Sequence, residues 1–221
     1  ISFSGYAAAI IGHNPTQSIL TGAENDHIMM MQRLFTELEA RKYRRVGMAL
    51  HVATSQRTDY HYKLAYAHLQ MSLPREDRVP VFNLSDLPRD QFMTWLKTHK
   101  PDVVISKYEI VQKWLEEAGL SVPGQIGYAS LDLPAPDNTT SGLYFDDERV
   151  ASVAVDQLTA SIYRNDTGIP DIPQLVSILG SWVDGETLRL AAPTLNTSPK
   201  SGNRKRSRRE VSVWEDAKAT G

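Results

Sequence analysis

The sequence predicts an α/β protein with a largely parallel sheet flanked by helices. Short runs rich in β-branched residues alternate with stretches of about 10–17 residues whose apolar side chains recur at helical spacing. The clearest unit spans residues 101–132, where a strand at 103–106, a helix at 108–118 and a strand at 126–131 follow one another. Gly119 ends the helix, since glycine readily adopts a left-handed conformation. Two parallel strands need such a crossover.

In the first half of the chain, the sequence pattern predicts three strands and two further helices. We expect strands at 7–11, 46–50 and 79–84, the last beginning near Pro80. Asn25 or Asp26 can cap a helix that runs to about residue 41. A polar loop at 51–56 precedes a helix that Arg57 opens and that extends to Met71. The buried stripe expected on the helix near residues 26–41 comprises Ile28, Met31, Leu34, Phe35 and Leu38.

The second half continues the alternation and then loses it. We expect helices at 89–99 and from Asp146 or Asp147 to about residue 163, with strands at 143–145 and 175–179. For residues 181–188 we expect irregular structure. Residues 191–221 have no periodicity and are rich in Ser, Thr, Pro and basic residues, which predicts a disordered tail.

Composition limits the class of protein. The 221 residues include no cysteine, which excludes disulfides and thiolate metal sites and fits a cytoplasmic protein, although exported bacterial proteins also lack cysteine. No apolar run approaches the ~20 residues of a membrane span, so no membrane partner is expected. The N-terminus shows no secretory signal. Because the chain begins with Ile1 and not with Met, we expect it to be a fragment or to have been cut.

Charge is unevenly distributed. Residues 192–221 carry seven Lys or Arg and three acids, a net charge of +4, whereas the remainder carries 17 basic and 23 acidic residues, a net charge of −6. The body is therefore no electrostatic match for nucleic acid. The tail sequence GNRKRSRRE can contact nucleic acid or simply be solvated.

Motifs for catalysis and for cofactors are missing. The sequence has no GxGxxG or GxxxxGK[ST] phosphate loop and no GxSxG nucleophile elbow. Its six histidines never fall as HxH or HExxH. We therefore expect neither an enzyme, nor a metal site, nor a cofactor.

Polar residues follow several predicted strands, which is the layout of a ligand cleft in an open α/β sheet. They are Arg57, Ser106, Lys107 and Asp132, with Phe145 nearby. An arginine can pair with an anionic or hydroxyl-rich ligand, and a carboxylate can accept hydrogen bonds from vicinal hydroxyls. Spacing alone leaves a second interpretation open, in which Arg57 begins a surface helix and Asp132 caps a loop.

Four stretches carry a family resemblance, namely ELEARKYRRVGMAL, SQRTDYHYKLAYAHL, LEEAGLSVPGQIGYASLD and TTSGLYFDDERVASVAVDQL. Together they resemble the effector-binding domain of LacI/GalR-family transcriptional regulators, whose fold is similar to that of periplasmic sugar-binding proteins. The resemblance covers roughly residues 25–190.

The resemblance implies a set of ligand-binding residues. Arg57 matches the arginine that reaches the ligand in this family, and Asp132, the last residue of the third stretch, matches the first acid after the family's glycine-aromatic pair. Asp26 or His27 matches the Asp-Asn that opens a helix. Phe145 takes a position where some sugar-responsive members have glutamine, and Ser106-Lys107 stand where the family has Asn-Asp.

The resemblance also implies an organisation and a function. Residues 1–43 and 146–163 would form an incomplete N-terminal lobe, and residues 44–145 and 164–190 a more complete C-terminal lobe. The implied function is sensing of a small-molecule effector, a carbohydrate, by a homodimer that binds DNA through a helix-turn-helix absent from this chain. The alternative is a stand-alone or exported sugar-binding protein of the same fold.

Overall fold

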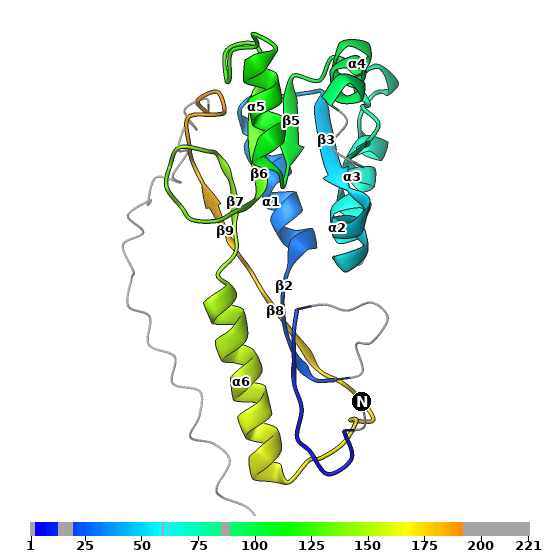
Figure 1. Ribbon diagram of the computed structural model, residues 1–221, viewed down its shortest axis with the longest axis vertical. Helices are drawn as coiled ribbons and strands as arrows, with labels where there is room; N and C mark the ends of the chain where they lie inside the picture. The colour runs from blue at the N-terminus through cyan, green and yellow to red at the C-terminus, as the bar shows by residue number, and fades with distance from the viewer. Residues whose placement is uncertain (1–2, 13–19, 59, 85–88, 192–221) are drawn as a thin grey trace, which may run out of the picture.

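The protein consists of a larger lobe and a smaller lobe, one beyond the other along its long axis (Figure 1). The computed structural model describes residues 3–12, 20–58, 60–84 and 89–191, and for Arg57 the backbone only. The predicted tail thus lies outside the described residues from residue 192 onwards. Within the described part, every strand pair but one is parallel, which confirms the predicted α/β class.

The larger lobe contains a six-stranded sheet in the order β4-β3-β5-β6-β7-β9. Its first five strands run parallel, and β9 pairs antiparallel with β7. Helices connect β3 to β4 and β5 to β6, as parallel neighbours usually require, whereas a loop connects β6 to β7. The strands are β3 (Val46–His51), β4 (Phe82–Leu84), β5 (Val103–Ser106), β6 (Gly127–Leu133), β7 (Gly142–Tyr144) and β9 (Ser181–Val183).

Helices cover both faces of this sheet because alternate strand residues point to opposite sides. Val103 and Ile105 pack in one buried cluster with α1 and α3, whereas Val104 packs in the other with α4 and α5. The helices are α1 (His27–Ala40), α2 (Val52–Arg57), α3 (His61–Ser72), α4 (Arg89–His99) and α5 (Glu109–Glu117), with a short 3-10 helix η1 (Arg75–Asp77).

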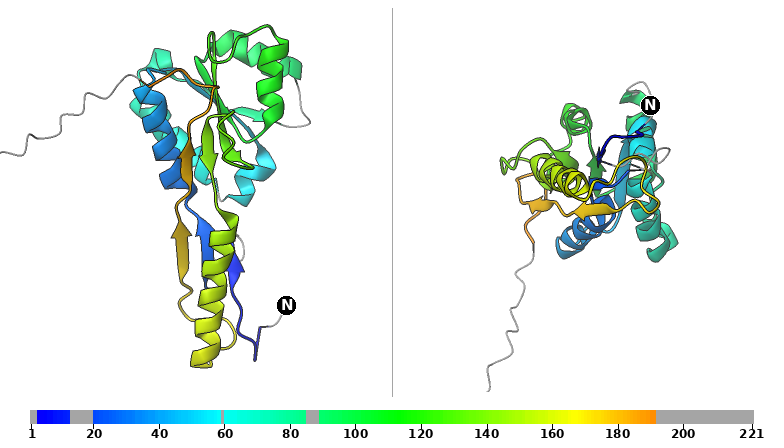
Figure 2. Two further views of the ribbon diagram at one scale, coloured as in Figure 1. Left: turned by 90° about the vertical axis from the view of Figure 1, so that its left-hand side faces the viewer. Right: turned by 90° about the horizontal axis from the view of Figure 1, so that it is seen from below.

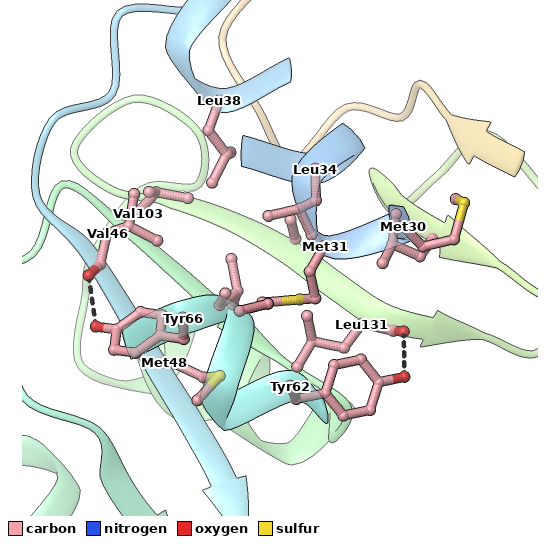
Figure 3. Close-up of a cluster of buried hydrophobic side chains, with 14 of the residues drawn as sticks. Met30, Met31, Leu34, Leu38, Val46, Met48, Tyr62, Tyr66, Val103 and Leu131 are labelled. Atoms are coloured by element: carbon pink, nitrogen blue, oxygen red, sulfur yellow. Dashed lines mark hydrogen bonds between the residues drawn. The ribbon is translucent and has the colours of Figure 1, made fainter. Parts of the chain in front are cut away.

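Two tyrosines of α3 combine apolar packing with buried hydrogen bonds (Figure 3). The Tyr66 hydroxyl lies 2.8 Å from the Val46 carbonyl oxygen, and the Tyr62 hydroxyl donates to the Leu131 carbonyl oxygen at 3.3 Å. Both rings are about 1% exposed, so these bonds satisfy polar groups that burial would otherwise leave unpaired.

The smaller lobe is a three-stranded parallel sheet in the order β1-β2-β8, with α6 alongside it (Figures 1 and 2). Ala23 of this sheet is buried with Val150 and Ala154 of α6. Three connections pass between the lobes, namely β2 to α1, β7 to α6 and β8 to β9. The elements are β1 (Ile10–Ile11), β2 (Gly22–Asn25), β8 (Leu175–Ile178) and α6 (Asp147–Arg164).

The division into lobes differs from the predicted one in two places. Residues 27–40 were assigned to the N-terminal lobe, but α1 packs on the larger sheet, where Met31 is fully buried. Residues 164–190 were assigned to the C-terminal lobe, but β8 pairs with β2 of the smaller sheet. The chain therefore crosses between the lobes at Asn25–Asp26 and again between β8 and β9.

Several element boundaries also correct the predictions. Arg57 ends the short helix α2 instead of opening a long helix, and Asp132 lies inside β6, next to its last residue. The predicted irregular segment contains β9, which the partner strand β7 stabilises. On α1, Ile28 is 37% exposed, and Met30 at 4% takes its place in the core. None of the described helices is long and apolar enough to cross a membrane.

Candidate functional site

A cavity of about 1300 Å³ lies at the carboxyl end of β5 and β6. Its walls come from α5, from the loop after β6, and from the start of α6, so both lobes contribute to it. Lys107, Asp132 and Phe145 all line this cavity. The structure thus brings together three of the predicted site residues at the end of the sheet where open α/β folds bind ligands.

Lys107 and Asp132 form an ion pair in the cavity wall. Lys107 directly follows β5, and Asp132 lies near the end of the neighbouring strand β6. Parallel pairing therefore places the two side chains at one sheet edge although 25 residues separate them. Their side chains are 31% and 30% exposed, so both remain accessible from the cavity.

Ser106 has a structural position instead. It is fully buried, does not line the cavity, and its hydroxyl accepts a hydrogen bond from the Tyr108 backbone N–H at 3.1 Å. The Tyr128 hydroxyl donates to the Tyr108 carbonyl oxygen at 3.1 Å. These two bonds fix the turn from β5 into α5 and so orient the intervening residue, Lys107.

His27 lies at the junction of the lobes, where α1 begins. Its ring centroid is 4.8 Å from that of Tyr62 and 5.0 Å from that of Phe145, the latter in an edge-on arrangement. Its Nδ1 atom is buried and has no hydrogen-bond partner among the described residues. Burial lowers the pKa of His27 from 6.5 to about 4, and repulsion from His61 and Lys107 contributes in the same direction.

Side chains at the lobe connections set their geometry. Asp26 accepts a hydrogen bond from the Met29 N–H at 2.9 Å and caps α1, and Asp146 caps α6 in the same way. The Asn25 amide donates to the Asp147 carboxylate at 3.1 Å, which ties two of the three connections together. The caps fix where each connection ends and each helix begins.

The arrangement is suited to binding a polyhydroxylated molecule. An ammonium group donates hydrogen bonds and a carboxylate accepts them, and a sugar hydroxyl can do both. Phe145 adds apolar surface. Among the described residues there is no group of three or more His, Asp or Glu side chains that could hold a metal ion.

Comparisons with known proteins find structural likeness only. No family model matches the chain, and no curated protein does. The transcriptional regulator CelR in complex with cellobiose gives a TM-score of 0.59 at 14% identity over 80% of this chain and 57% of that one. A LacI family transcriptional regulator from Enterococcus faecium with bound ribose gives a TM-score of 0.58 at 11% identity over 78% of this chain and 67% of that one.

A third solved structure has a similar score. It is a periplasmic binding protein/LacI transcriptional regulator from Alkaliphilus metalliredigens QYMF complexed with D-xylulofuranose, with a TM-score of 0.57 at 11% identity over 78% of this chain and 67% of that one. The likeness shows that this chain shares the fold of these LacI-type and periplasmic-binding-protein-like structures. The chain spans 57–67% of the length of these three proteins.

Arg57 completes the list of predicted site residues in the LacI-type fold. Its backbone ends α2, just beyond the carboxyl end of β3, but its side chain lies outside the described part of the structure. Its contact with a ligand therefore stays a prediction.

Sequence reasoning assigned some cavity residues to other roles. Asp146 and Asp147 were interpreted as helix caps, and Asp146 does cap α6, yet both also line the cavity. Tyr108 and Tyr144, also in the lining, were not predicted as site residues at all. The available signal was their position, because each lies within two residues of a predicted strand end.

Proposed function

We propose that this chain is the effector-sensing part of a bacterial DNA-binding transcriptional regulator and binds a small carbohydrate in the cavity between its lobes. The observation that carries the proposal is the meeting of Lys107, Asp132 and Phe145 in a cavity to which both lobes contribute. The three solved structures described above, which contain cellobiose, ribose and D-xylulofuranose, support a carbohydrate as the effector.

The ligand would act by changing the relative stability of two lobe arrangements. A molecule that contacts the larger lobe through Asp132 and the smaller lobe through α6 binds the arrangement that offers both contacts more tightly. Its binding therefore favours that arrangement, and linkage transmits the preference to DNA binding. In this proposal the domain binds and releases its ligand without catalysis.

DNA binding would come from a helix-turn-helix outside this chain, presented by a homodimer. We propose that α5 of the larger lobe contributes to the dimer contact. Trp114 is 5% exposed and belongs to the core, so the contact would use exposed residues that do not line the cavity, such as Glu117 and Ala118. Sedimentation velocity is expected to show a dimer that Glu117→Lys weakens, and a monomer at every concentration would contradict this part.

Calorimetric titration with ribose and cellobiose tests the proposed site. We expect Arg57→Ala and Asp132→Ala to lose most of the binding shown by the unaltered chain, because each removes a group that hydrogen-bonds hydroxyls. The matched controls are Arg75→Ala and Asp171→Ala, whose side chains are exposed and do not line the cavity. If both site variants bind like the unaltered chain, the cavity is not the ligand site.

The second candidate is a stand-alone or exported sugar-binding protein of the same fold. The likeness to a protein described as a periplasmic binding protein/LacI transcriptional regulator favours this candidate. The gene sequence upstream of Ile1 separates the two candidates. An encoded helix-turn-helix supports the regulator, and an encoded signal peptide supports the exported binder.

A further inference from the structure

The Lys107–Asp132 pair has hydrogen-bonding capacity left over. An ammonium group has three hydrogens, and a carboxylate can accept about four hydrogen bonds. Among the described residues, each of these two charged groups has the other as its ion-pair partner. Roughly a third of each side chain is exposed, and both line the cavity. The pair therefore presents free donors and free acceptors side by side.

This combination is complementary to two adjacent hydroxyls. One hydroxyl oxygen can accept from the Lys107 ammonium while the other hydroxyl donates to Asp132, and the ion pair itself persists. A lone carboxylate can only accept. Lys107 thus adds the missing donor and also lowers the desolvation cost of Asp132, since opposite charges bury more readily together than alone.

The other charges of the cavity determine which hydroxylated molecules can enter. Among the described residues of its lining, Lys107 and Lys113 are basic, against seven acidic ones. With Asp132 neutralised by Lys107, the remaining wall carries an excess of negative charge that repels anions. The seven acidic residues are Glu109, Glu116, Asp132, Asp137, Asp146, Asp147 and Glu148.

We infer that Lys107 is a specificity-determining residue, and that its ion pair with Asp132 selects a neutral molecule with vicinal hydroxyls over its phosphorylated or acidic counterparts. The inference rests on the proposed carbohydrate function and names the ligand class of that site. Neither feature alone is enough: the pair supplies the hydrogen-bonding pattern, and the acidic wall supplies the discrimination against anions.

The test compares matched neutral and anionic probes on the full chain. Calorimetry compares the affinity for ribose with that for ribose 5-phosphate, glucose with glucuronate, and cellobiose with cellobionate, at one fixed salt concentration. The variants are Lys107→Met, Asp132→Asn, the two combined, and Lys113→Met. Lys113→Met removes the same charge from the same cavity but leaves the ion pair intact, so its comparison with Lys107→Met reports the pair itself.

We expect the neutral member of at least one probe pair to bind at least about ten-fold more tightly than its anionic counterpart. Lys107→Met should weaken this binding about ten-fold more than Lys113→Met. Because Lys107 and Asp132 act as a unit, the fold-loss of affinity in the combined variant should be much smaller than the product of the fold-losses in the two single variants. Circular dichroism of every variant verifies that the fold is retained.

Two results overturn the inference while leaving the proposed function intact. One is tighter binding of the anionic probes, and the other is equal affinity of Lys107→Met and Lys113→Met for a neutral sugar that the unaltered chain binds. If the unaltered chain binds none of the six probes, the proposed carbohydrate function fails together with the inference.

Discussion

Protonation of His27 should destabilise the folded protein. The imidazole packs among Tyr62 and Phe145 at the start of α1, with its Nδ1 atom buried and unpaired among the described residues. Asp26 and Asp147 favour the charged ring, but burial outweighs them and lowers the pKa to about 4. The unfolded chain, where the ordinary pKa of 6.5 applies, therefore takes up this proton first.

The size of the effect follows from the two pKa values. The contribution of the neutral ring is complete well above pH 6.5 and is lost as the pH falls from there toward 4. A pKa difference of one is worth about 1.4 kcal/mol. Between pH 7 and pH 5, the free energy of unfolding should therefore fall by about 2 kcal/mol through His27 alone.

Urea unfolding at a series of pH values measures this loss. The variant His27→Gln cannot take up the proton, so its free energy of unfolding should fall by about 2 kcal/mol less than that of the unaltered chain between pH 7 and pH 5. His68→Gln is the matched control, because His68 is exposed on α3. Parallel pH profiles for the unaltered chain and His27→Gln would refute the argument from burial.

Three substitutions test the packing of the larger lobe by chemical denaturation. Met31→Ala should cost about 2–5 kcal/mol because the side chain is fully buried, and Met29→Ala on the same helix, 49% exposed, should cost under about 1 kcal/mol; equal costs would place α1 outside the core. Tyr66→Phe should cost about 1–2 kcal/mol because it removes a buried hydroxyl that bonds two carbonyls, whereas Tyr163→Phe, 87% exposed, should change nothing measurable. Arg41→Met should lower the free energy of unfolding by about 2–4 kcal/mol, since Arg41 is buried and pairs with two acids. An unchanged free energy of unfolding would show that apolar contacts alone hold α1 against β9.

The sequence predicts best those elements whose structure depends on local pattern. The helix at 89–99 and the strand at 103–106 have the predicted bounds, because the helix presents a clear apolar stripe and the strand is a short β-branched run. The helix near residues 26–41 was predicted with Asn25 or Asp26 as its cap, and in the structure Asp26 is the cap. Capping and periodicity are properties of neighbouring residues.

Pairing between distant segments could not be predicted in the same way. β9 has only three residues and gains its hydrogen bonds from β7, some 40 residues earlier in the chain. The assignment of α1 and β8 to lobes depends on which sheet each one contacts, and neither periodicity nor composition encodes that choice. The stripe on α1 was displaced for the same reason, since its partners decide which side is buried.

The candidate site also combines features that the sequence predicts with features that depend on contacts between distant segments. Lys107 and Asp132 were predicted as site candidates because each lies at the carboxyl end of a predicted parallel strand, and the structure shows that they form an ion pair. His27 was predicted from the family resemblance and Phe145 from both its place at a strand end and the resemblance, but the contact between their rings was not predicted. Ser106 illustrates the limit of the argument, because a residue at a strand end can point inward and bond the backbone.

The distribution of the cavity residues between the lobes matters most for the proposed sensing. Lys107 and Asp132 belong to the larger lobe, whereas Asp147 and Glu148 lie on α6 of the smaller one. A ligand held only by the ion pair would bind equally well in every lobe arrangement and shift nothing, however tightly it bound. A reversal of a 1:99 equilibrium needs about 5.5 kcal/mol of differential binding. The sensing function therefore requires contacts from α6, and substitutions there should reduce coupling to DNA more than they reduce affinity.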